Sequence, residues 1–259
     1  MAFMPRGNRY IVPGYVYHLT HRCHDRKFLL KFACDRHRYR QRLREAVLEL
    51  QVSLLSYNVT SNHVHLVAYS DDEEQISLLM QQAAGEFARD YNRRKGRSGA
   101  VWNGRYHATM VDSGEYLWEC LLYVELNMVR CGAVAHPSQW QWSGYSELMG
   151  LKRRNRLLDI ERLLELLRNV SLHDFRNNFE HGLRKRIAED KCRRDPKWTE
   201  SVGVGSLDFI DALRTRVPLG RGLERRQESG GWTGGDRGGA SPGAGRCSAT
   251  TLERFHPAP

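Results

Sequence analysis

The segment from Asn62 to Tyr69 constrains the fold more than any other part of the chain. It reads Asn-His-Val-His-Leu-Val-Ala-Tyr, an apolar run with two histidines one residue apart. Because side chains on a β-strand alternate between faces, His63 and His65 would share one face, about 7 Å apart, while Val64 points into the core. Two imidazoles at that spacing can bind one cation, since histidine is the commonest metal ligand. The alternative is two half-exposed histidines at a sheet edge.

A second pair of polar residues lies in the apolar helical segment from Tyr116 to Arg130. Tyr123 and Asn127 are four residues apart, so a helix would present them on one face, together with Cys120 and Arg130. Two imidazoles, an amide and a phenol are the parts needed for metal-assisted nucleophilic attack on a phosphodiester. The alternatives are a core tyrosine and a packing or helix-capping asparagine.

Periodicity along the first 130 residues predicts an α+β fold. Runs rich in β-branched and aromatic residues predict strands within residues 10–23, after Pro13-Gly14, and over 52–59, 63–69 and 107–111. Helical spacing predicts helices from Asp35 to about Leu50, from Asp71 into the basic stretch after Tyr91, and over Tyr116 to Arg130. The order β-α-β-β-α-β-α matches a ferredoxin-like antiparallel sheet with helices on one face.

Beyond residue 150 the sequence predicts a small helical region and then a tail. We assign residues 1–150 to the sheet domain, 151–217 to a helical C-terminal module, and 218–259 to a tail. Helices are expected over Asp159 to Val170, over Leu172 to Glu189 and from Gly205 to Leu213. Ten of the 26 residues from 220 to 245 are glycine, so the tail has too little apolar surface to order and should be disordered.

The chain carries a formal net charge of +10, from 40 Lys and Arg against 30 Asp and Glu. This balance favours a polyanionic partner, nucleic acid first and a membrane surface second. The sequence lacks a run of about 18 apolar residues and an apolar signal segment, so a cytoplasmic protein is expected. Six cysteines without a CxxC pair argue against a zinc module or a disulfide framework. His18, His21 and His24 alternate faces on the first strand and are not expected to form a second metal site.

The ordered motifs resemble those of the single-strand tyrosine transposases with an HUH motif (His, hydrophobic, His). In detail they look most like the REP-associated tyrosine transposases of bacteria. The resemblance covers roughly residues 5 to 150 and rests on Pro13-Gly14-Tyr15-Val16-Tyr17-His18-Leu19-Thr20, Asn62-His63-Val64-His65, Asn103-Gly104-Arg105-Tyr106, Tyr123 to Gly132, and Trp140-Gln141-Trp142-Ser143-Gly144-Tyr145. The resemblance implies the same ferredoxin-like sheet, with the HUH strand near its centre.

The resemblance also implies a reaction. His63, His65 and Asn127 would hold Mg²⁺ or Mn²⁺, and Tyr123 would cleave single-stranded DNA through a 5′-phosphotyrosine intermediate, followed by strand transfer. No nucleotide cofactor is needed, because one phosphoester replaces another. Asn127 departs from the glutamine of the wider class and resembles the REP-associated branch.

The implied substrate is single-stranded DNA with a folded hairpin, such as a repetitive extragenic palindrome. Cationic side chains to hold phosphates and aromatic faces to stack on bases are what single-strand binding requires. The residues expected to contact DNA are Arg6, Arg9, Arg93, Arg94, Lys95, Arg97, Arg105, Tyr106 and Arg130. A nucleoid-associated monomer or homodimer, without membrane contact, is expected. Two alternatives remain: a hairpin DNA- or RNA-binding protein that does not cut, and a metal-dependent phosphodiesterase that activates water.

Overall fold

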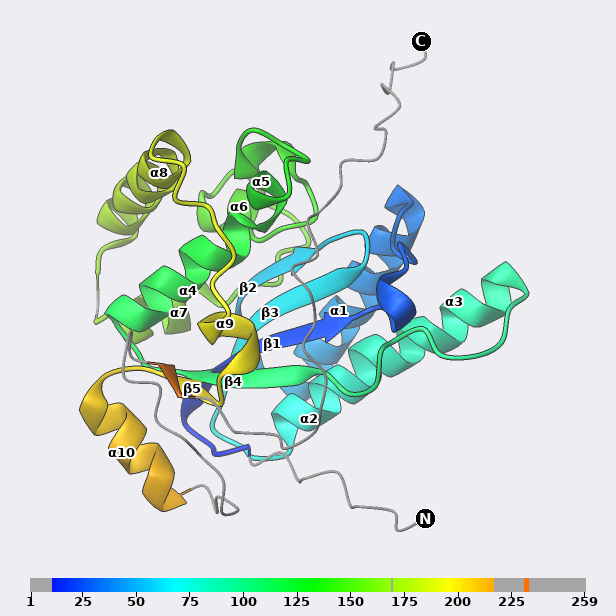
Figure 1. Ribbon diagram of the computed structural model, residues 1–259, viewed down its shortest axis with the longest axis horizontal. Coiled ribbons are helices and arrows are strands. Elements are labelled where there is room, and N and C mark those ends of the chain that lie inside the picture. The colour runs from blue at the N-terminus through cyan, green and yellow to red at the C-terminus, as the bar shows by residue number, and fades with distance from the viewer. Residues whose placement is uncertain (1–10, 169, 217–230, 233–259) are drawn as a thin grey trace, which may run out of the picture.

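A mostly antiparallel sheet forms the centre of the computed structural model, which describes residues 11–168, 170–216 and 231–232 (Figure 1). Its first four strands are β1 (Tyr15–Arg22), β2 (Ser53–Val59), β3 (His63–Ser70) and β4 (His107–Val111). They lie in the order β2-β3-β1-β4, and every neighbouring pair is antiparallel. This is the ferredoxin-like order predicted from the sequence, with the histidine strand β3 in the interior of the sheet.

The first face of the sheet is covered by α1 (Ala33–Leu50), α2 (Gln75–Met80), a π-helical stretch η2 (Gln81–Glu86) and α3 (Phe87–Lys95). Tyr17, Leu19 and Leu66 of the strands pack there against Tyr39 and Phe87 of the helices. The structure corrects two predicted boundaries. The first helix begins at Ala33 rather than at Asp35, and the second at Gln75 rather than at Asp71. Asp35 therefore lies inside the first turn of α1, whose N-cap is Phe32, and the acidic run from Asp71 precedes α2, whose N-cap is Glu74.

The second face is covered by α4 (Glu115–Glu125), α5 (Asn127–Arg130), α7 (Ile160–Leu166), α8 (Leu172–Ala188) and α9 (Lys197–Glu200). Val16 and Val67 of the strands share this core with Leu117, Phe175 and Trp198. Figure 1 shows α4 and α8 to the left of the strands, and α2 and α3 to their right. The prediction of helices on one face of the sheet therefore holds for the βαββαβ core. α4 and the C-terminal helices form a second layer on the other face.

The C-terminal part of the chain contributes to the sheet as well as to the helical layer. β5 (Gly203–Val204) pairs in parallel with β4, and β6 (Gly231–Trp232) pairs with β5. The sequence analysis predicts helices here but no strand. The predicted helices are found as α7, α8 and α10 (Leu207–Arg216). The proposed division at residue 150 stays a prediction, and apart from residues 231–232 the predicted tail lies outside the described residues.

The remaining elements are short: η1 (His24–Arg26), η3 (Pro137–Gln139) and α6 (Tyr145–Leu148). Five of the cysteines lie in the described part of the chain, and all five are free thiols. Among the described residues, no helix combines the length and the apolar character that crossing a membrane requires.

The single helix predicted from Tyr116 to Arg130 is interrupted. α4 ends at Glu125, Leu126 has φ −75° and ψ 1°, and α5 starts at Asn127. The buried carboxylate of Glu125 accepts hydrogen bonds from the Ser56 hydroxyl of β2 and from the backbone N–H of Tyr145. These bonds hold the end of α4 against the sheet, directly beside the histidine strand.

Candidate active site

The two histidines of β3 share one face of the sheet, and Val64 between them is fully buried on the other, as the alternation predicts. Their ring centroids are 4.8 Å apart. Asn127, at the start of α5, brings its side-chain amide to 2.9 Å from His65 Nε2 and to 3.4 Å from His63 Nε2. The structure therefore brings Asn127 to two histidines that lie 64 and 62 positions earlier in the chain.

The hydrogen bonds of His63 determine which of its ring nitrogens carries the proton. Its Nδ1 lies 2.7 Å from Asn62 Oδ1, and the Asn62 amide is oriented by donating to the carbonyl oxygen of Arg26. Because a carboxamide oxygen can only accept, Nδ1 of His63 must be the donor. Its Nε2 therefore presents a lone pair toward Asn127.

Burial keeps both imidazoles neutral. It lowers the pKa of His63 to about 3 and that of His65 well below the usual range; neighbouring cationic and imidazole groups add to the effect. A neutral imidazole is the form that binds a metal. Both rings are therefore in their ligating state at neutral pH.

The donor atoms at this point suit a divalent cation. Within the described ranges there is no group of three or more His, Cys, Asp and Glu side chains placed to hold a metal, so a cation here needs the amide of Asn127 as a third ligand. Rotating that amide by 180° would replace Nδ2, which faces the two Nε2 atoms, with the oxygen that a cation requires. Two imidazole nitrogens and one amide oxygen form a mixed set compatible with Mg²⁺, Mn²⁺ and softer divalent ions.

Tyr123 projects from α4 toward the same point. Its ring centroid lies 6.1 Å from that of His65, and the guanidinium of Arg130 lies over the ring at 4.1 Å. The side chain is almost covered, with 6% of its surface exposed. Burial raises the pKa of Tyr123, while the positive charges of Arg130 and Arg194 oppose that shift. The phenol is therefore protonated at neutral pH, next to two cationic groups that would stabilise its anion.

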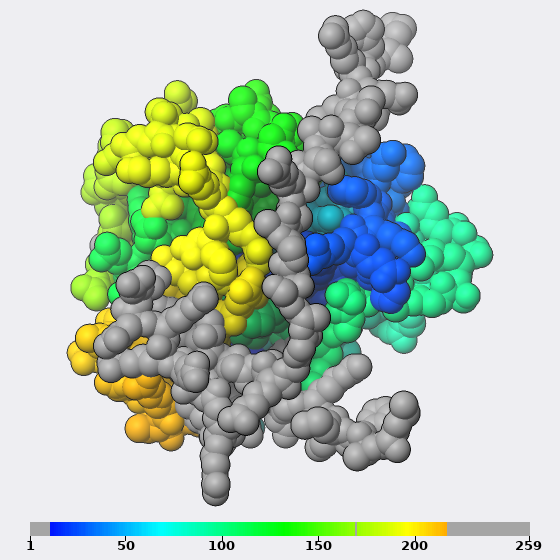
Figure 2. Space-filling view, in the orientation of Figure 1, coloured from blue at the N-terminus to red at the C-terminus, as the bar shows by residue number. Residues whose placement is uncertain are grey.

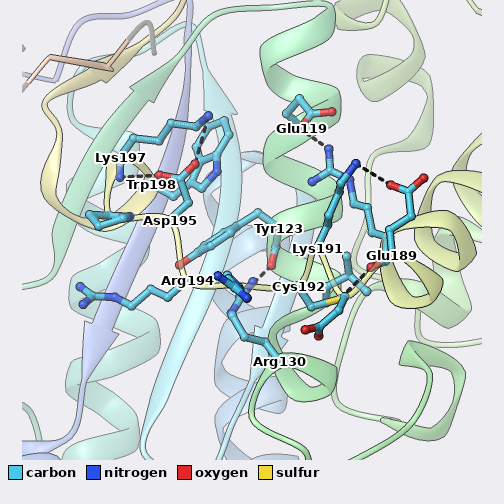
Figure 3. A pocket seen from close by; sticks show the side chains of 15 residues that line it. Glu119, Tyr123, Arg130, Glu189, Lys191, Cys192, Arg194, Asp195, Lys197 and Trp198 are labelled. Atoms are coloured by element: carbon cyan, nitrogen blue, oxygen red, sulfur yellow. Dashed lines mark hydrogen bonds and ion pairs between the residues drawn. The ribbon is translucent and has the colours of Figure 1, made fainter. Parts of the chain in front are cut away.

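A pocket of about 540 Å³ opens beside Tyr123, between α4 and the segment 189–198 (Figure 3). Figure 3 shows Tyr123 projecting into this pocket, between Arg130 and the segment that carries Arg194 and Trp198. A second hollow, of about 380 Å³, opens on the histidine side. It is lined by Thr20, Arg22, Arg26, His63, His65, Asn103, Arg105, His107, Arg194 and Thr199. Arg194 lines both, so the phenol and the histidines are reached from adjoining basic hollows.

Figure 2 shows the 190–204 segment in yellow and the N-terminal β1–α1 segment in blue on one face of the molecule. Of the arginines around the histidine hollow, the sequence analysis names only Arg105. Arg22 lies opposite His63 in the antiparallel register of β1 and β3, and Arg26 follows in the next loop. Only the strand register could have identified Arg22, because it is 41 positions from His63.

Other residues expected to contact DNA lie away from the histidines. Arg93, Arg94 and Lys95 end α3, which packs on α1 over the opposite face of the sheet. Arg93 forms an ion pair with Asp90, and Arg94 with the buried Asp35. Arg97 follows this helix, and Tyr106 contacts Ser77 through its hydroxyl at 3.3 Å. Arg6 and Arg9 lie outside the described residues. A DNA-binding role for this set stays a prediction.

His18 is the residue that the sequence analysis missed. It is fully buried, stacks on His65 with ring centroids 5.1 Å apart, and places Nε2 2.9 Å from His65 Nδ1. His21, by contrast, points to the other face and stacks on Trp102. Strand alternation therefore does separate His18 from His21, as predicted, but it places His18 beside the first histidine pair.

Comparison with known proteins finds one matching family model and similar solved structures. Residues 11–127 match the family described as IS200-like transposases. A solved structure of a REP-associated tyrosine transposase bound to a REP hairpin is 18% identical, with a TM-score of 0.47, over 60% of this chain and 94% of that one. A putative transposase from Deinococcus radiodurans is 20% identical, with a TM-score of 0.33, over 42% of this chain and 87% of that one. The search of curated proteins gives no match.

The matched range contains the four strands of the ferredoxin-like sheet, both histidines of β3, Tyr123 and Asn127. Residues 11–127, slightly less than half of the chain, are therefore similar to the IS200-like transposases.

Proposed function

We propose that the protein cleaves and rejoins single-stranded DNA at hairpin sequences of the REP type, with Tyr123 as the nucleophile. The observation that carries the proposal is the position of Tyr123, whose ring lies 6.1 Å from that of His65. The Nε2 atoms of His65 and His63 in turn converge on the amide of Asn127. The similarity of residues 11–127 to the IS200-like transposases supports the same proposal.

His63, His65 and Asn127 would hold the divalent cation, Mg²⁺ or Mn²⁺. Bound there, it would polarise the scissile phosphate and stabilise negative charge on the departing 3′ oxygen. Asn62 and Thr60 orient the ring of His63, since Nδ1 lies 2.7 Å from Asn62 Oδ1 and 3.0 Å from Thr60 Oγ1. The ligating nitrogen is therefore fixed by a hydrogen-bond partner on the other side of the ring.

In the cleavage step the Tyr123 oxygen forms a bond to phosphorus while the bond from phosphorus to the 3′ oxygen breaks. The phenol loses its proton, and the released 3′ oxygen gains one, so the products are a 5′-phosphotyrosine and a free 3′ hydroxyl. Arg130, 4.1 Å from the ring, favours the phenolate that attacks. The reverse reaction with a different 3′ hydroxyl rejoins strands without an external energy source.

The basic hollow around the histidines would hold the phosphates on either side of the cleaved bond. Arg22, Arg26 and Arg194 converge there from β1, from the loop after it and from the C-terminal segment. Because these side chains contact phosphate rather than base edges, they would bind many sequences. Selection of a hairpin rests on the resemblance of the motifs to the REP-associated enzymes, as do the proposed nucleoid association and the monomeric or homodimeric state.

A second candidate is a phosphodiesterase that uses the same cation site to activate water. The burial of Tyr123 favours this candidate, because the phenol must be uncovered before it can attack. A non-cleaving hairpin-binding protein would need neither the cation nor Tyr123.

Incubating single-stranded hairpin DNA, labelled on the 3′ fragment, with the protein and Mn²⁺ tests the proposal on a denaturing gel. The label should move as a protein adduct that is resistant to heat and detergent. Tyr123→Phe should lose the adduct and still bind DNA, whereas the control Tyr116→Phe, at the opposite end of α4, should keep it. A free 5′ phosphate as the first product would instead identify the water-activating enzyme.

A further inference from the structure

A chain of hydrogen bonds leads from the C-terminal segment to the histidine pair. The carbonyl oxygen of Trp198 lies 2.8 Å from His18 Nδ1, and His18 Nε2 lies 2.9 Å from His65 Nδ1. On its far side, His65 Nε2 lies 2.9 Å from the amide of Asn127. Trp198 is 133 positions away from His65 in the sequence, yet only one side chain separates them in space.

The donor and acceptor properties of these groups determine the direction of each hydrogen bond in the series. A carbonyl oxygen can only accept, so His18 Nδ1 must donate to Trp198. In a neutral imidazole the other nitrogen is then an acceptor, so His18 Nε2 must receive its hydrogen bond from Nδ1–H of His65. His65 is thereby held with its proton on Nδ1 and with a lone pair on Nε2.

From this geometry we propose that His18, held by the Trp198 carbonyl, is a positioning residue that fixes His65 in its metal-ligating tautomer and orientation. The consequence for the cation rests on the proposed function, but the tautomer itself does not. The parallel stacking of the two rings, with 9° between their planes, restricts the same orientation from the side.

The Trp198 carbonyl, which begins this series of hydrogen bonds, is itself held in place. Trp198 is buried, and its carbonyl also lies 3.2 Å from the hydroxyl of Thr109 on β4. Beyond Ser201, β5 pairs with β4 and anchors the segment to the sheet. The indole of Trp198 also lies against Tyr123, with ring centroids 6.0 Å apart. The C-terminal segment therefore contacts both the proposed nucleophile and the support of one proposed ligand.

Loss of a group that supports a metal-ligating histidine typically lowers metal affinity about 10- to 100-fold. His18→Phe keeps a ring that can stack on His65 and removes both nitrogens. His18→Gln keeps an acceptor and a donor at the end of a side chain of similar reach. Thr109→Val is the matched control, because it removes a buried hydroxyl from the same carbonyl without breaking the chain to His65.

The test uses the full protein in two measurements. Long-range ¹H–¹⁵N spectra of the metal-free, ¹⁵N-histidine-labelled protein report the tautomer of each ring. Titration with Mn²⁺ alone, followed by its electron paramagnetic resonance signal, reports affinity. We expect His65 with its proton on Nδ1 in the wild type and in Thr109→Val. In His18→Phe the proton should shift toward Nε2 and Mn²⁺ affinity should fall at least tenfold, with His18→Gln intermediate.

A wild-type His65 protonated on Nε2 would overturn the inference, and so would an unchanged tautomer in His18→Phe. If His18→Phe does not fold, His18→Gln and the wild-type spectrum decide in its place. Failure of the wild type to bind Mn²⁺, with the expected tautomers present, would count against the proposed function and leave the positioning role of His18 supported.

Discussion

The two faces of the central sheet are made from the same strands, and both carry an apolar core, but they differ chemically along β3. Toward α1 and α3, β3 presents Val64 and Leu66 to an apolar core. Toward α4, the same strand presents His63 and His65 to an amide, a phenol and a further imidazole. Alternation along one strand therefore supplies both a packing surface and a chemical one.

The contrast shows how the free-energy cost of burying polar groups is offset. Burying a polar group without a hydrogen-bond partner costs free energy of folding, so the imidazoles of the α4 face are paired. Along β3 the α1 face contributes apolar burial, whereas the α4 face contributes the imidazoles, which are surrounded by a second apolar core. If this division holds, substitutions of the apolar β3 residues on the α1 face should change mainly stability, and substitutions of the histidines should change mainly chemistry.

The largest effect should come from His65→Ala. Removing one ligand of the proposed cation should lower cleavage on the order of 10³-fold or more, because cation stabilisation of the transition state contributes several kcal/mol. The midpoint of thermal unfolding should also fall, because the truncation leaves buried His18 Nε2 without its partner, but the protein that remains folded should be inactive. Cleavage of labelled hairpin DNA and a melting curve measure the two quantities; a variant that is unfolded but not specifically inactive would break the comparison.

Leu66→Ala makes the opposite test on the neighbouring residue. Leu66 is fully buried on the α1 face, so its truncation should lower the free energy of unfolding by about 2–5 kcal/mol. Below its melting temperature the folded fraction should cleave DNA at the wild-type rate. Urea unfolding measures the free energy of unfolding, and activity per folded molecule measures the cleavage rate. A selective loss of activity would show that the two faces are coupled.

Asn127→Ala should be milder than His65→Ala, because two imidazoles remain. We expect cleavage to fall at low Mn²⁺ concentration and to recover in part as Mn²⁺ is raised. Tyr123→Phe is the control, since no metal concentration can replace the missing oxygen. Equal recovery of both variants would exclude Tyr123 as the nucleophile.

Acid should weaken the α4 face in particular. Burial lowers the pKa of His18 and of His63 to about 3. A folded-state pKa below the ordinary value of about 6.5 means that folding favours the neutral ring. This stability is fully present above pH 6.5 and is lost as the pH falls from 6.5 toward 3. Urea unfolding measures the free energy of unfolding at pH 7.5 and at pH 5. The loss of this free energy between the two pH values should be smaller for His18→Phe than for wild type, whereas Leu66→Ala should show the same loss as wild type.

The smallest effect concerns which arginines bind DNA. Removing Arg22 from the histidine hollow should flatten the slope of log affinity against log salt by about 0.7 for one lost phosphate contact. Replacing Arg93, Arg94 and Lys95 together should flatten it by less per residue, because two of them are engaged in ion pairs on the α3 side. A larger change from the α3 triple variant than from Arg22→Ala would move the binding surface to the other face.

Local pattern determined much of this molecule. The order of strands and helices up to β4 gave the ferredoxin-like sheet, because alternation and helical spacing are short-range properties of a chain. The same alternation put His63 and His65 on one face, and the spacing of Tyr123 and Asn127 indicated a second element of the site. The motifs in their order indicated the transposase family.

Tertiary structure decided what depends on contacts between distant segments. The register of β1 against β3 placed Arg22 opposite His63, and the packing of Glu125 on the sheet coincides with the break before Asn127. The pairing of β5 with β4 brought the carbonyl of Trp198 to His18. The local sequence around His18 or Trp198 does not predict this last contact, because the two residues are 180 positions apart and meet only when the whole sheet has formed.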